Sequence, residues 1–176
     1  PIGACRGFLD NVARIVRDTQ PARLVACVDL DWRPAFRVQA VPSYKLHRTV
    51  EGGAEDEPPT LAPQVEVLLE VLEALGVAVV GMPGFEADDV IGTLATRGTG
   101  AVDVVTGDRD LLQLVRDDRP VRVLYTVEKL KAYDEAAVTA WLDRRPSATI
   151  NASYTEGRVS GRTLLMLAAD NGHERL

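Results

Sequence analysis

The sequence predicts an α/β fold in which a mostly parallel sheet is flanked by helices. Short Val-rich apolar runs recur along the chain, and such runs are typical of parallel strands buried on both faces. Longer segments with helical periodicity lie between them, and acidic residues follow the ends of several runs. The alternation predicts βαβ units with right-handed crossovers.

The expected helices and strands alternate in chain order. Phe8, Val12 and Ile15 recur at helical spacing and predict a helix before the first strand. A second helix begins near Val65, and Gly76 follows its apolar stripe as a C-terminal stop. The expected strands cover residues 24–28, 77–81, 102–105 and 121–125, and further helices surround residues 90–94 and 111–115.

Two segments depart from this alternation. Residues 49–63 carry a Gly-Gly pair, three prolines and four acids. A loop of this length in a compact domain is usually functional or disordered. After Arg144 the alternation is lost, and only residues 163–169 offer a short helix. We therefore expect a core domain over residues 1–144 and a separate segment over residues 145–176.

Composition excludes several classes of protein. The 176 residues are 46% hydrophobic and 26% charged, and no apolar run approaches the ~20 residues of a membrane span. The chain has no secretory signal pattern, so we expect a cytoplasmic protein in which Cys5 and Cys27 are buried thiols. The net charge of −6 disfavours a general polyanion binder, although local patches decide nucleic-acid binding.

Carboxylates gather where expected strands end or helices begin. Because the carboxyl ends of parallel strands meet at one edge of a sheet, these acids would repel one another unless a cation lay between them. Oxygen ligands of this kind suit Mg²⁺ or Mn²⁺ rather than zinc. Taken singly, each group could instead be an acidic helix start or a turn that caps the next helix. The residues are Asp29, Glu86, Asp88, Asp89, Asp108 and Asp110.

A basic segment follows the first expected strand. Lys and Arg beside an anionic metal cluster suit phosphate chemistry, in which they hold the non-bridging oxygens. A solvated basic face is the common alternative. Tyr44 could stack on a base, and it could equally be a packing residue. The segment contains Arg33, Arg37, Tyr44, Lys45, His47 and Arg48.

With these motifs in this order, the chain resembles the bacterial 5′-nuclease (flap endonuclease) family. This family includes the N-terminal nuclease domain of bacterial DNA polymerase I and stand-alone actinobacterial relatives. The resemblance covers residues 1–142. The matching motifs are PIGA and GFL within residues 1–9, DLDWRPAFR from Asp29, YKLHR from Tyr44, EADDVIG from Glu86 and TGDRD from Thr106.

The resemblance implies a PIN-like fold with a helical arch over the active site, and residues 49–63 would belong to that arch. It implies divalent-metal-dependent hydrolysis of DNA phosphodiesters at 5′ ends or flap junctions in replication and repair. The six carboxylates would bind Mg²⁺ or Mn²⁺ in a two-metal site. Lys45 and Arg48 would act as catalytic cations on the scissile phosphate. Tyr44 would stack near the displaced nucleotide, and Arg37 would support phosphate binding, so these four residues form the implied DNA-binding set.

The chain also departs from the family pattern. The family's first strand, which carries an Asp ligand, would precede Pro1. The downstream Gly-Asp-x-x-Asp pair and the helix-hairpin-helix element have no match in residues 145–176. We therefore expect an incomplete second metal site, no K⁺ site, and weak or absent catalysis by the chain as it stands. The loss of pattern suggests a truncated, alternatively joined or frame-shifted end.

The expected partner is DNA with a 5′ flap or a 5′ single-stranded end, bound by a monomer in the bacterial nucleoid, with a polymerase as partner or fusion. One alternative is an inactive remnant that binds metal or nucleic acid weakly. Another is a PIN-type ribonuclease. A haloacid-dehalogenase-type phosphohydrolase fits poorly, because Trp32 follows Asp31 and Leu112 stands where a second acid is needed.

Overall fold

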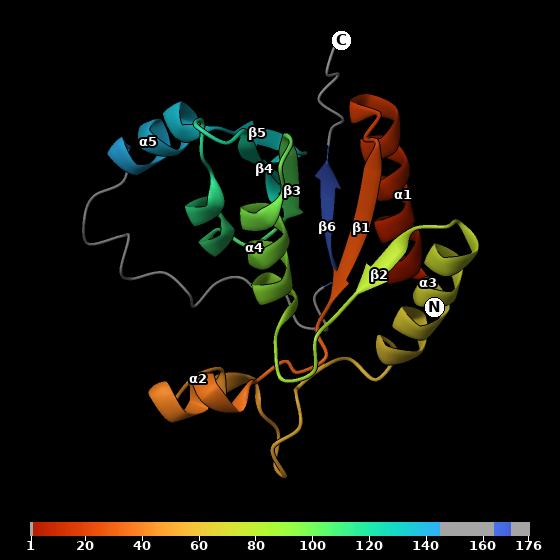
Figure 1. Ribbon diagram of the computed structural model, residues 1–176. Helices are drawn as coiled ribbons and strands as arrows, with labels where there is room; N and C mark the ends of the chain where they lie inside the picture. Colours follow the sequence, from red (N-terminus) through yellow and green to blue (C-terminus); the bar gives the residue numbers. More distant parts are fainter. Residues whose placement is uncertain (1, 145–163, 170–176) are drawn as a thin grey trace.

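The computed structural model describes residues 2–144 and 164–169, and its described strands form one six-stranded sheet (Figure 1). The order across the sheet is β2-β1-β6-β3-β4-β5. The strands are β1 (Arg23–Val28), β2 (Ala78–Val80), β3 (Val102–Thr106), β4 (Val121–Tyr125), β5 (Lys131–Tyr133) and β6 (Leu164–Ala169).

Four of the six described strands run in the same direction, in agreement with the expected mostly parallel sheet. β1 pairs in parallel with β2, and β3 pairs in parallel with β4. β6 is antiparallel to both of its neighbours, so β1 and β3 also point the same way. β5 is antiparallel to β4. The carboxyl ends of β1, β2, β3 and β4 therefore lie at one edge of the sheet.

The helix expected over residues 163–169 is wrong, because residues 164–169 form strand β6. Its register places Leu167 opposite Val25 of β1 and opposite Val104 of β3. A short apolar run carries no periodicity that separates a helix from a strand. The backbone groups of β1 and β3 require hydrogen-bond partners, and they favour a strand here. The other residues of segment 145–176 lie outside the described part of the chain.

Helices cover both faces of the sheet (Figure 1). α1 and α3 pack against each other and lie on one face, while α4, η2 and α5 lie on the other. The helices are α1 (Gly3–Thr19), α2 (Ala35–Ala40), α3 (Ala62–Ala74), α4 (Ala87–Arg97) and α5 (Glu135–Asp143), and the 3₁₀ turns are η1 (Leu46–Arg48), η2 (Asp110–Leu114) and η3 (Thr126–Glu128).

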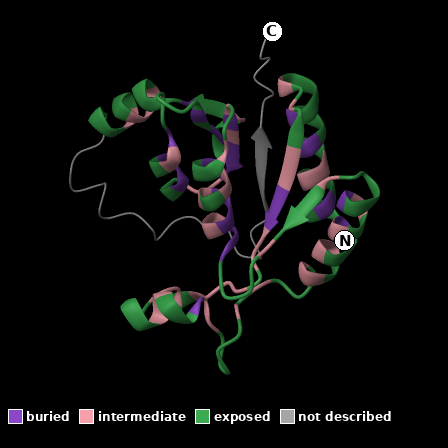
Figure 2. Cartoon of the chain, in the orientation of Figure 1, coloured by how far each residue is buried: buried purple, intermediate pink, exposed green. Residues whose placement is uncertain are grey.

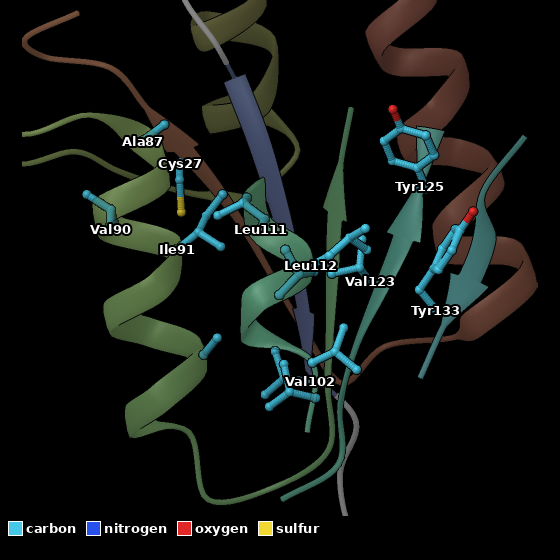
Figure 3. Packing of buried hydrophobic residues seen from close by; sticks show 14 residues of the cluster. Cys27, Ala87, Val90, Ile91, Val102, Leu111, Leu112, Val123, Tyr125 and Tyr133 are labelled. Carbon is cyan, nitrogen blue, oxygen red and sulfur yellow. The ribbon is translucent and has the colours of Figure 1, made fainter. Parts of the chain in front are cut away.

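The core is divided between the two faces because successive strand residues point to opposite sides. Val104 of β3 packs with Ile91 of α4 in the larger cluster, which Figure 3 shows at close range. The next residue, Val105, packs with Val12 and Ile15 of α1. Figure 2 shows buried residues along β1, β3 and β4 and on the inward faces of these helices. Helices on both faces therefore pack against the sheet whose parallel strands end at this edge.

The segment between β1 and α3 contains two short helical pieces and a hairpin. Where the resemblance implies an arch, the structure has α2, η1 and a turn closed by an antiparallel bridge between Thr49 and Glu55. This segment lies beyond the end of β1, away from the core (Figure 1). In the described part of the chain, no helix combines the length and apolar character needed to cross a membrane.

Candidate functional site

Acidic residues from three separate elements meet at the edge where the parallel strands end. Asp29 directly follows β1, and Asp108 follows β3 after one glycine. Asp88 lies in the first turn of α4, which begins after β2. In Figure 1 this edge is the lower end of the sheet, where β1 and β2 stop and α4 starts. The expected convergence of these acids at one edge follows from the direction of the strands.

The pKa of Asp88 is shifted by burial and by the neighbouring acids. Its pKa is raised to about 7, first by burial and then by the negative charges of Asp108, Asp29 and Glu86. Lys45 acts in the opposite direction. The Oδ1 atom of Asp88 is enclosed and has no hydrogen-bond partner among the described residues. A buried carboxylate oxygen without a partner is costly, so this position favours a positive charge beside it.

Backbone contacts hold the neighbouring carboxylates in place. The Ala87 amide donates to Asp29 Oδ1 over 2.5 Å, which ties the end of β1 to the start of α4. The Asp110 amide donates to Asp108 Oδ1 over 2.8 Å, and the Asp108 amide donates to Thr106 Oγ1 over 2.9 Å. Burial and the charge of Asp108 raise the pKa of Asp110. The acids after β3 are therefore fixed by a local turn.

Glu86 and Asp89 cap α4 and bind cations from the basic segment. Their side chains form a capping box, in which the Glu86 amide donates to Asp89 Oδ2 over 3.0 Å. Glu86 is only 4% exposed. Its Oε1 forms an ion pair with Lys45, and its Oε2 accepts a 2.6 Å hydrogen bond from the Tyr44 hydroxyl. Arg37 contacts both acids, with Nε 2.8 Å from Glu86 Oε2 and Nη2 paired with Asp89.

These contacts bear on which residues could hold a metal ion. As the side chains stand, no group of three or more His, Cys, Asp or Glu residues among residues 2–144 and 164–169 is arranged to bind one. Glu86 and Asp89 are occupied by Arg37 and Lys45. The oxygen donors of the remaining four acids, including the enclosed Asp88 Oδ1, fit a hard divalent cation. These four are Asp29, Asp88, Asp108 and Asp110.

The basic segment is fixed to the edge by several contacts. Lys45 Nζ donates to the Trp32 carbonyl over 3.0 Å, in addition to its pair with Glu86. Arg33 donates to the carbonyl oxygens of Tyr44 over 2.7 Å and Pro42 over 3.1 Å. Arg33 therefore braces the loop that presents Lys45. The sequence marked Arg33 as a cation but gave no sign of this bracing role.

The hairpin after Arg48 brings two further acids to the site, which the sequence analysis missed. Burial raises the pKa of Glu55 most, and the charges of Glu57 and Asp29 raise it further, whereas Lys45 and Arg48 lower it. Both glutamates are half-buried. A Gly-Gly turn with acids at alternate positions could have indicated a hairpin with an inward face.

Known proteins match most of this chain in sequence. The sequence model of the 5'-3' exonuclease N-terminal resolvase-like domain matches residues 1–143. A 5'-3' exonuclease of Streptomyces coelicolor is 56% identical over 146 residues, which cover 78% of this chain and 48% of the relative. A 5'-3' exonuclease of Mycobacterium tuberculosis is 54% identical over 133 residues, covering 71% and 42%.

A DNA polymerase I of Mycobacterium bovis is 45% identical over 125 residues, which cover 69% of this chain but only 13% of the polymerase. The chain spans about half the length of the exonuclease relatives, 48% and 42% in the two cases. The matched region contains β1 to β5, the acidic edge and the basic segment. The chain therefore belongs to the 5'-3' exonuclease family through its N-terminal resolvase-like domain.

Proposed function

We propose that this protein hydrolyses phosphodiester bonds of DNA at 5′ ends or flap junctions, with Mg²⁺ or Mn²⁺ bound at the acidic edge. One observation carries the proposal. Asp29, Asp88 and Asp108 come from three elements, and burial together with the charges of Asp108, Asp29 and Glu86 raises the pKa of Asp88 to about 7, while its enclosed Oδ1 has no partner among the described residues. Such a cluster suits a divalent cation. Family membership supports the nuclease assignment.

The proposed ion ligands are Asp29, Asp88, Asp108 and Asp110. When bound, the divalent cation would supply an activated water and stabilise charge on the phosphate oxygens. The protein's part is to hold the carboxylates in position, through the amides of Ala87 and Asp110. Glu86 and Asp89 would not bind the ion directly, because Arg37 and Lys45 already neutralise them.

Lys45 and Arg48 are proposed to bind the scissile phosphate. The ammonium group of Lys45 lies at the acidic edge, held by Glu86 and by the Trp32 carbonyl. A cation there can bind the non-bridging oxygens of a phosphate that also reaches the acids. Tyr44 is fixed by its hydrogen bond to Glu86, and we propose that its ring face stacks on a nucleotide base.

We also propose that the protein serves DNA replication and repair, with a polymerase as partner or fusion. Three polymerases named DNA polymerase I from mycobacteria match 69% of this chain at 45% identity within much longer sequences. A nuclease domain beside a polymerase would act on 5′ strands that the polymerase displaces. Such a role would place the protein with the chromosome in the cytoplasm.

A cleavage assay with matched substrates tests the proposed function. The wild-type protein is incubated with a labelled 5′-flap DNA, the same flap made of RNA, and an unbranched duplex, each with Mg²⁺, Mn²⁺ or EDTA. We expect metal-dependent cutting near the DNA flap junction, with less cutting of the RNA flap. Preferential cutting of the RNA flap would instead assign the site to ribonuclease chemistry.

Lys45→Ala provides the matched variant for this assay. It removes the proposed phosphate contact but leaves the four proposed ion ligands in place. We expect slower cleavage of the DNA flap, by roughly 10²-fold or more, because a transition-state charge contact is lost. Cleavage at the wild-type rate by Lys45→Ala would show that the basic segment does not act on the phosphate.

A further inference from the structure

The hairpin over residues 49–57 is a defined turn beside the basic segment. The Val50 amide donates to the Ala54 carbonyl over 3.0 Å, and the Asp56 amide donates to the Arg48 carbonyl over 2.7 Å. Gly52 and Gly53 both have positive φ angles, of 97° and 83°, which form the tip. The hairpin therefore returns the chain to Arg48 with a fixed orientation of its second arm.

The second arm presents its acids alternately to the site and to solvent. Glu55 and Glu57 are half-buried, whereas Asp56 between them is exposed. This is the period of two that an extended segment gives. Glu57 Oε2 is enclosed and has no hydrogen-bond partner among the described residues. Two carboxylates are thus turned inward although the outward side of the same arm is open to water.

Glu55 lies within electrostatic range of the cations proposed to bind phosphate. Glu55 interacts with Lys45 and Arg48, and also with Asp29 at the acidic edge. In the part of the chain that the structure describes, neither Glu55 nor Glu57 forms an ion pair with these cations. The negative charge of Glu55 therefore reduces the positive potential at Lys45 and Arg48 without forming an ion pair that fixes the two cations, and Glu57 adds a second charge beside Glu55.

We propose that Glu55, supported by Glu57, determines how strongly Lys45 and Arg48 bind a nucleic-acid phosphate. A phosphate that approaches these cations is repelled by the carboxylate of Glu55. Nucleic acid that contacts only the two cations is therefore bound weakly, and a productive strand needs further contacts along the site. This inference rests on the proposed function, because it assumes that Lys45 and Arg48 bind phosphate.

The test is the affinity of the full chain for a fluorescein-labelled single-stranded DNA, measured by fluorescence anisotropy at low salt with EDTA. Glu55→Gln removes the charge and keeps the shape. Asp56→Asn is the matched control, because it removes one charge from the adjacent, outward position. We expect Glu55→Gln to bind roughly three- to tenfold more tightly than the wild type, as the removal of a nearby unit charge predicts. Asp56→Asn should change the affinity by less than about twofold.

A double-mutant cycle with Arg48→Ala separates charge competition from a structural effect. In the Arg48→Ala background we expect the gain from Glu55→Gln to fall below about twofold, because one of the two cations is gone. Equal effects of Glu55→Gln and Asp56→Asn would overturn the inference, as would an unchanged gain without Arg48.

The wild type and Lys45→Ala provide the check on the underlying function. If these two proteins bind the DNA equally, or if neither the wild type nor Glu55→Gln binds it, the proposed phosphate site fails and the inference fails with it. If Lys45→Ala binds less tightly than the wild type and Glu55→Gln matches Asp56→Asn, the proposed function stands and only the inference is overturned.

Discussion

Asp88 is the residue at which the cost of the acidic edge is concentrated. Its pKa is raised from 3.8 to about 7. Between these pH values the folded protein therefore binds more protons than the unfolded chain, and the free energy of unfolding falls as the pH rises. Above about pH 7 the full destabilisation is present. Ionised Asp88 therefore lowers the free energy of unfolding of the metal-free protein.

The first prediction concerns Asp88→Asn in metal-free buffer. The amide cannot ionise, so we expect this variant to be more stable than the wild type at about pH 8, by roughly 1–3 kcal/mol. The difference should shrink towards about pH 4, where the wild-type carboxyl is protonated in the folded state. Urea denaturation with EDTA at the two pH values measures it. Equal stability of the two proteins at about pH 8 would show that ionised Asp88 does not destabilise the fold.

Glu86 has a different role, because its charge is neutralised within the protein. It is 4% exposed, and it contacts Lys45, Tyr44 and Arg37. The exposed fractions of the Lys45 and Arg37 side chains are 18% and 32%. Removal of Glu86 would leave these cations partly buried without their main counter-charge, which is more costly than the loss of the attraction itself.

The second prediction follows from this pairing. We expect Glu86→Ala to lower the free energy of unfolding by roughly 3 kcal/mol or more, and Glu86→Gln by less because the amide still accepts hydrogen bonds. Glu51→Gln, on the exposed side of the hairpin, should have almost no effect. Chemical denaturation compares the three proteins. A Glu86→Ala variant as stable as the wild type would contradict the pairing.

Among the elements, α4 connects the sheet to the site. It begins with the capping box of Glu86 and Asp89, and its first-turn amide at Ala87 binds Asp29. The chain reaches this start through Gly84, which has a φ angle of 78°. A glycine is needed there because other residues adopt this backbone conformation only with strain. The turn before α4 therefore sets the positions of Glu86 and Asp89, and of the Ala87 amide that binds Asp29.

The third prediction compares two glycines. Gly84→Ala should lower the free energy of unfolding by roughly 1 kcal/mol or more, because alanine is strained at positive φ although no atom blocks its methyl group. Gly7→Ala, in the exposed middle of α1, should raise it by roughly 0.5–1 kcal/mol through helix propensity. Thermal denaturation of both variants checks this opposite sign. The same sign in both would refute the role given to the turn.

The elements also show how far the sequence could predict the fold. The strand expected at residues 121–125 is β4 itself, and that at 102–105 lacks only Thr106 of β3, because Val-rich buried strands carry a strong local signal. β5 was missed, and β6 was expected to be a helix. β5 covers only three residues, and the backbone partners that make β6 a strand lie in distant parts of the chain.

The site also has some features that local sequence predicts and others that depend on contacts between distant residues. The gathering of Asp29, Asp88 and Asp108 was predictable, because parallel strands end at the same edge of a sheet. The pairing of Lys45 with Glu86 was not, because these residues are 41 positions apart and only the folded loop brings them together. The inward direction of Glu55 likewise depends on the hairpin, which local composition marked only as a long loop.

At the scale of the whole molecule, the sheet depends on a strand from outside the region that matches the family. The family match covers residues 1–143, whereas β6 begins at Leu164. β6 lies between β1 and β3 and pairs with both, over six and four residue pairs. Without it, two inner strands would lose one hydrogen-bonded neighbour each, and the two halves of the sheet would lose their connection.

The fourth prediction compares two shortened chains. A chain that ends at residue 163 lacks β6, and we expect it to lose cooperative unfolding or to melt at a much lower temperature than the full chain. A chain that ends at residue 169 keeps β6 and should melt close to the full chain. Circular dichroism on heating measures both. Equal melting of the two shortened chains would show that β6 does not hold the sheet together.

The molecule as a whole thus places Asp29, Asp88, Asp108 and Asp110 at one edge of the sheet, next to the basic segment that contains Lys45. We propose that this edge holds a divalent cation, and a calorimetric titration of the full chain with Mn²⁺ tests this directly. We predict binding by the wild type, at least tenfold weaker binding by Asp108→Asn, and wild-type binding by Asp143→Asn on the exposed side of α5. No binding by the wild type, or equal binding by all three proteins, would show that the acidic edge does not hold a divalent cation.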